Sequence, residues 1–207
     1  MDDQRDIRIS RNRLEALVDS IFAFAMTLLV TGLAIPHLSK TEAEAKLAIS
    51  IAGMRSEFIS FLVAFFVLAS FWLMHHRQFY YVRRVDSGIM RINLFILACV
   101  VLMPFTTNIS GDYSNVRVAV DLFHINMFSL GLFFLIHWWY LTRNPDITSV
   151  EISSRDASNG MLRCLITPVI SALGFVLSFI SPSWSMATYL LIIPCVAIVR
   201  RYCQCRI

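Results

Sequence analysis

Long apolar runs separated by short charged segments dominate the hydropathy pattern of this 207-residue chain. Because roughly 20 apolar residues cross the hydrocarbon core of a membrane as a helix, each such run predicts one transmembrane segment. The uncharged runs cover residues 20–36, 58–74, 92–111, 122–142 and 164–199. The last run is too long for one crossing, and the motif "SPSW" at 181–184 predicts a turn within it. The pattern therefore predicts six spans.

The expected fold class is an all-α membrane protein with six transmembrane helices per subunit and no soluble domain. One domain covers residues 1–207, because no connection is long enough to fold alone. The second helix is extended beyond its uncharged run, since the stretch before Phe58 keeps apolar residues at helical spacing. The expected helices cover about 9–36, 42–78, 87–110, 117–142, 159–180 and 184–203.

Composition supports this class and sets an orientation. Hydrophobic residues make up 57% of the chain and charged residues only 15%, which is typical of an integral membrane protein. Fourteen of the eighteen lysines and arginines fall on the side of the predicted bundle that carries both termini. The positive-inside rule therefore places both termini in the cytoplasm. The net charge of +4 indicates topology, and no nucleic-acid partner is expected.

The first predicted helix has two kinds of polar position. At about 100° per residue, one stripe of the helix collects residues that lie within about 80° of one another. Its members are Arg13, Leu17, Ser20, Phe24, Thr27 and Thr31. Such a mixture of hydroxyl and apolar groups suits a narrow passage lined by copies of one helix, but also ordinary packing between membrane helices.

Asp19 points about 120° away from this stripe and needs a partner within the protein, because an ionised carboxylate is costly in lipid. The segment "FWLMHHRQF" at 71–79 offers Trp72, His75 and His76 at the same side of the membrane. We expect a polar clasp between the first two helices, which Arg13 could join. Acid–base catalysis by these groups is an alternative. A shared metal site is geometrically poor because adjacent histidines diverge on a helix, so no metal or other cofactor is expected.

Fingerprints of hydrolases, nucleotide-binding proteins and other enzymes are absent from the sequence. The sequence also lacks a TVGYG-like filter and an arginine-repeat voltage sensor. If ions cross the membrane here, side chains of a helix must form the constriction.

Three stretches resemble one known family: "RLEALVDSIFAFAMTLLV" at 13–30, "FWLMHHRQF" at 71–79 and "NLFILACVVLMPFTT" at 93–107. They are similar to segments of the bacterial transmembrane protein 175 family, relatives of the lysosomal potassium channel, and occur in the same order. The resemblance implies a homotetramer in the bacterial inner membrane, with the first helix of each subunit lining a central pore. It also implies modest selectivity for potassium over sodium. The expected partners are further copies of the chain, membrane lipid and permeant potassium ions.

The resemblance assigns roles to individual residues. In the family signature, Arg is followed by three residues and then Phe-Ser-Asp; here Arg13 and Asp19 match, whereas Leu17 and Val18 replace the Phe-Ser pair. The narrowest ring aligns with Phe24, which would form a hydrophobic gate. Further pore positions align with Thr27, Leu28 and Thr31, and the clasp positions with Arg13, Asp19, Trp72, His75 and His76. Ser20, which shares the same stripe, is the remaining expected pore residue.

The leading hypothesis is a tetrameric potassium channel. A secondary transporter, or a proton-coupled or proton-leak membrane protein, is the alternative, although transporters commonly contain the repeats that this chain lacks. A membrane enzyme that uses Asp19, His75 and His76 is a third possibility, but nothing supplies a nucleophile or a metal site.

Overall fold

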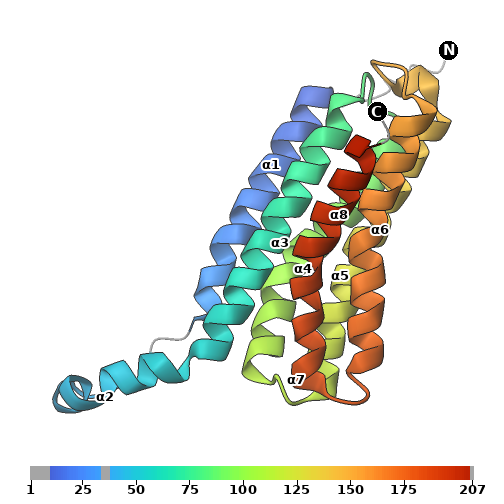
Figure 1. Cartoon of the computed structure of the whole chain (residues 1–207). Coiled ribbons are helices and arrows are strands. Elements are labelled where there is room, and N and C mark those ends of the chain that lie inside the picture. The colour runs from blue at the N-terminus through green and yellow to red at the C-terminus, as the bar shows by residue number, and fades with distance from the viewer. Residues whose placement is uncertain (1–9, 34–37, 206–207) are drawn as a thin grey trace.

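The computed structural model describes residues 10–33 and 38–205. It is a bundle of long helices (Figure 1). Six of its helical segments are long and apolar enough to span a membrane, which confirms the predicted fold class and the span count. In the described part of the chain, the only β-pairing is an isolated bridge between Val82 and Thr148.

The described elements follow one another as α1 Arg11–Leu28, η1 Leu29–Gly32, α2 Lys40–Gly53, α3 Arg55–Tyr80, α4 Ser87–Asp112, α5 Arg117–Arg143, η2 Pro145–Ile147, α6 Ser154–Leu177, α7 Pro182–Ser185, η3 Met186–Leu191 and α8 Ile192–Cys205. Here η denotes a 3₁₀-helix.

The structure divides the helix that we expected over 42–78. Helix α2 begins after a capping box between Ser39 and Glu42 and ends at Gly53, and α3 follows after Met54. Glycine favours the end of a helix. The apolar periodicity of the sequence does not reveal that the direction of the helix axis changes at this point. Figure 1 shows α2 extending away from the foot of α1 and α3.

The segment expected as a helix over 184–203 is also composite. It begins as the short helix α7 at Pro182, continues as the 3₁₀-helix η3 and becomes α-helical from Ile192 in α8. Proline at the first helical position sets the start of α7, because its fixed φ suits a first turn.

The helices pack in a sequence that leaves α1 at one edge of the subunit. Helix α1 lies against α3 and α4, α4 packs on α5, α5 packs on α6, and α8 contacts α6. Gly131 of α5 allows close approach to Pro168 of α6, since an added Cβ would lie 2.7 Å from the proline Cδ. The start of α1 and the end of α8 lie at the same end of the bundle (Figure 1), as an even number of spans requires.

Candidate functional site

Helix α1 has one buried face and one bare face. The buried face carries Leu14, Val18, Phe22, Ala25 and Leu29, each no more than 1% exposed. Arg13, Leu17, Ser20, Phe24, Thr27 and Thr31 are all exposed in the subunit, whereas Leu28 is half-buried. Phe24 is the barest large apolar side chain of α1, at 63% exposure. The stripe identified in the sequence is therefore the face that the subunit leaves uncovered.

Comparison with α4 distinguishes this face from an ordinary lipid-facing surface. The exposed side chains in the middle of α4 are all apolar: Leu94, Phe95, Ala98, Val101, Leu102 and Phe105. Its polar residues Asn93, Thr106, Thr107 and Ser110 are buried. On α1 the arrangement is reversed, because the hydroxyl groups point outward and the buried face is apolar.

Each hydroxyl of the bare face donates its hydrogen bond within α1. Ser20 Oγ donates to Ala16 O, Thr27 Oγ1 to Phe24 O and Thr31 Oγ1 to Leu28 O, all at 2.7 Å. A hydroxyl oxygen that has donated its proton to the backbone keeps lone pairs that can accept from water or contact a cation. The bare face thus presents hydroxyl oxygens that can accept hydrogen bonds, and none of these three hydroxyl protons lacks an acceptor.

Asp19 and Trp72 join α1 to α3. Trp72 Nε1 donates to Asp19 Oδ1 at 2.8 Å, and both side chains are half-buried. A hydrogen bond to a carboxylate is stronger than one between neutral groups, so this contact ties the two helices firmly together.

Of the other expected clasp residues, only His76 also contacts a polar group of α1. His75 is buried and its Nε2 lies 2.8 Å from Asn93 Oδ1 on α4, while the exposed His76 lies 3.6 Å from Glu15 of α1. Arg13 is exposed, and its guanidinium has no hydrogen-bond or ion-pair partner among the described residues. Within one subunit, the polar contacts between α1 and α3 therefore use the Trp72 indole and the His76 imidazole, whereas the His75 imidazole binds α4.

A buried polar network behind this contact was not recognised in the sequence. Gln78 donates through Nε2 to Phe134 O at 3.2 Å, and its Oε1 lies 2.6 Å from His137 Nδ1. Nearer the other end of α5, His124 lies within hydrogen-bond distance of Ser185 and Tyr189. Polar residues inside apolar spans signal such networks, but the sequence does not show which partner each one finds. In the described part of the chain, no group of three potential ligands could hold a metal ion.

Comparisons with known proteins find ion channels. The family model for "Endosomal/lysosomal potassium channel TMEM175" matches residues 13–104. A protein named as a potassium channel of Streptomyces collinus is 28% identical over 86% of this chain and 86% of its own length. Another, from Chamaesiphon minutus, is 26% identical and aligns over 82% of this chain and 84% of its own. The human protein named as an endosomal/lysosomal proton channel is 21% identical, and 31% of its length is matched.

Comparison with solved structures also finds potassium channels. The crystal structure of a lysosomal potassium-selective channel TMEM175 homolog from Chamaesiphon minutus superposes with a TM-score of 0.77 at 25% identity, covering 91% of this chain and 97% of that one. A variant of the potassium channel MtTMEM175, crystallised with a nanobody fusion protein, shares the fold, with a TM-score of 0.64 at 17% identity over 99% and 98% of the two chains. The family contains ion channels and not enzymes. This multi-pass membrane protein is therefore similar to TMEM175 channels, in sequence over residues 13–104, which match the family model, and in fold over most of its length.

Proposed function

We propose that the chain is one subunit of a homotetrameric, potassium-selective channel in the bacterial cell membrane, with residues 1–207 forming a single channel domain and both termini in the cytoplasm. Four copies of α1 surround the pore and turn their bare faces towards its axis. Phe24 forms the constriction in place of a filter of backbone carbonyls.

The observation that carries this proposal is the exposed row of hydroxyl groups on α1. Lipid offers no hydrogen-bond partners, and α4 shows how this chain arranges a helix against lipid, with hydroxyls inside and apolar groups outside. A face with exposed hydroxyls suits contact with water, with ions or with another copy of the chain. Four copies of α1 around an axis would give this face all three kinds of contact. The bacterial relatives are also named potassium channels.

The bare face divides into parts with different roles. The oxygens of Ser20 and Thr27 lie about one turn on either side of Phe24 and contact partly hydrated cations. Phe24, assisted by Leu28, excludes water when its ring turns towards the axis, because hydrophobic constrictions gate by dewetting. Thr31 makes the far end of the pore polar.

The clasp sets the position of the pore helix. The bond between Trp72 and Asp19 fixes the rotation of α1 on α3, and so determines which residues point to the axis. Arg13, which has no partner within the described subunit, contacts a neighbouring copy at the cytoplasmic mouth. His75 holds α3 against α4 through Asn93, and His76 lies beside Glu15.

Substitution of Phe24 by Ala tests the proposal. We expect Phe24→Ala to raise potassium flux into proteoliposomes, because the narrowest ring loses its bulk. Phe105→Ala is the matched control, since Phe105 is 58% exposed on the apolar face of α4. Equal effects of both variants, or no change with Phe24→Ala, would rule out Phe24 as the constriction.

Proton conduction is a second candidate, favoured by the animal relatives that are named proton channels. A pH-sensitive dye inside the same vesicles measures proton entry beside potassium flux. Flux that saturates with a fixed stoichiometry would indicate a transporter instead of a channel.

A further inference from the structure

A cavity of about 620 Å³ lies away from the bare face of α1, between α3, α5, α6 and α8. Its walls include Arg77 and Tyr81 after the middle of α3, Trp138 of α5, Arg163 of α6 and Val196 of α8. Sites for small molecules in proteins have volumes of about 300–1,000 Å³, so this cavity is large enough for a ligand.

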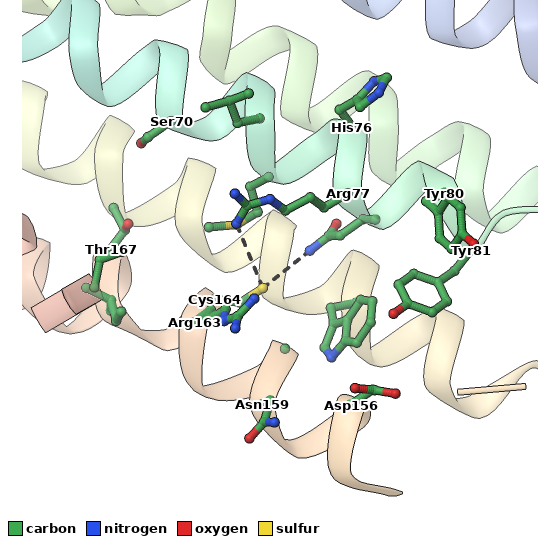
Figure 2. A pocket seen from close by; sticks show the side chains of 17 residues that line it. Ser70, His76, Arg77, Tyr80, Tyr81, Asp156, Asn159, Arg163, Cys164 and Thr167 are labelled. Carbon is green, nitrogen blue, oxygen red and sulfur yellow. Dashed lines mark hydrogen bonds between the residues drawn. The ribbon is translucent and has the colours of Figure 1, made fainter. Parts of the chain in front are cut away.

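The cavity is elongated and amphipathic. Its lining on α3 runs from Ser70 to Tyr80, which is about 15 Å along a helix. The polar or aromatic side chains of Tyr81, Asp156 and Asn159 lie at the end where α3 finishes, and Ser70 and Thr167 lie towards the other end (Figure 2). Apolar side chains also line the cavity, among them Leu73, Ile166 and Val196. A ligand that matches both kinds of lining needs a polar head and an apolar tail.

Two arginines give the polar part a positive charge. Arg77 and Arg163 enter the cavity from α3 and α6, and Figure 2 shows both side chains beside Cys164. Neither guanidinium has a hydrogen-bond or ion-pair partner among the residues that the structure describes.

Asp156, the one carboxylate that lines the cavity, forms no ion pair with either arginine among the described residues, because its side chain turns to the start of α6. Asp156 accepts from Ser153 Oγ at 2.8 Å, and its backbone N–H donates to the same oxygen. Two uncompensated guanidinium groups in a partly enclosed site favour a phosphate, which an arginine can bind through two parallel hydrogen bonds.

We propose that this cavity binds the phosphodiester headgroup of an anionic phospholipid, with an acyl chain along Leu73, Ile166 and Val196. The depth of the cavity in a membrane-spanning bundle favours a lipid over a soluble phosphate. Basic pockets between helices at the cytoplasmic side are typical sites for anionic headgroups. Trp138 and Tyr81, near the ends of α5 and α3, add aromatic side chains to the cavity wall, and such side chains are common beside lipid headgroups. The site is separate from the pore face, so it goes beyond the proposed conduction.

Native mass spectrometry of the purified full-length protein with added phosphatidylglycerol or phosphatidylcholine tests the proposal without measuring conduction. We expect phosphatidylglycerol to bind more tightly than phosphatidylcholine. Arg77→Gln combined with Arg163→Gln should weaken phosphatidylglycerol binding roughly 10- to 30-fold. The combination Arg77→Lys and Arg163→Lys keeps the charges and should retain most of the binding, which guards against misfolding of the glutamine variant.

Arg83→Gln combined with Arg84→Gln is the matched control. It removes the same charge from the exposed loop between α3 and α4, outside the cavity, and should change binding little. Equal weakening by both glutamine pairs would overturn the site in favour of general surface charge. Equal binding of the two lipids would also overturn it. Glycerol phosphate that competes as strongly as the intact lipid would show a soluble-anion site instead.

Discussion

Replacement of Trp72 by Phe isolates the contact that fixes α1 on α3. The variant keeps an aromatic ring but removes the indole N–H that donates to Asp19 Oδ1 at 2.8 Å. A hydrogen bond to a charged group contributes about 1.5–3 kcal/mol, and the half-buried carboxylate would lose its only described hydrogen-bond donor. At about 2–4 °C per kcal/mol for a domain of this size, the midpoint of thermal unfolding should fall by about 3–12 °C.

Asp19→Asn should cost less, because an asparagine oxygen still accepts from the indole and only the charge assistance is lost. The double variant should be no worse than Trp72→Phe alone, since the two residues act through one bond. Thermal unfolding in detergent, followed by intrinsic fluorescence or light scattering, measures the three midpoints.

Trp184→Phe controls for the loss of an indole in general, because Trp184 is 77% exposed and its indole makes no described hydrogen bond. If Trp72→Phe and Trp184→Phe unfold at the same temperature, the contact does not hold α1 in place. Additive losses in the double variant would contradict the reasoning as well, since they would mean that the two side chains act independently.

Three further substitutions test other parts of the structure. Thr27→Val keeps the shape but removes an exposed oxygen of α1, so potassium flux in proteoliposomes should fall while unfolding is unchanged; an unaltered flux would exclude Thr27 from the ion path. Gly131→Ala forces a Cβ against the rigid ring of Pro168 and should cost about 1–3 kcal/mol, whereas Gly53→Ala, which meets nothing within 4 Å, should leave unfolding unchanged. Phe22→Ala empties a fully buried site and should cost about 3–5 kcal/mol in the same unfolding assay; a loss below about 1 kcal/mol would contradict this packing.

The six spans follow from the sequence because hydropathy and length determine which segments cross a membrane. The division at Met54 does not follow, because α2 and α3 both keep helical spacing and only the direction of the axis changes between them. The 3₁₀ segment at Met186–Leu191 was missed for a similar reason, since its composition is as apolar as that of the helix that follows.

The bare stripe of α1 could be predicted from helical geometry, because its residues share one side at about 100° per residue. The partners of buried polar groups could not. His75 and Trp72 are three residues apart on α3, yet His75 reaches Asn93 on α4 while Trp72 reaches Asp19 on α1. Which of two neighbouring helices a side chain meets depends on the rotation of its own helix, and the sequence alone does not fix that rotation.

In the proposed channel, the two faces of α1 separate stability from conduction within one short helix. Phe22 and Phe24 are only two residues apart, yet the first is fully buried against the subunit and the second is 63% exposed. Because the apolar face already anchors α1 through its own subunit, the opposite face needs no packing to keep the helix folded and can change its side chains with little cost in stability. In the proposed tetramer, a ring of such faces can therefore combine a bulky residue such as Phe24 with flanking hydroxyls, and the bond between Asp19 and Trp72 would hold each α1 in the same rotation.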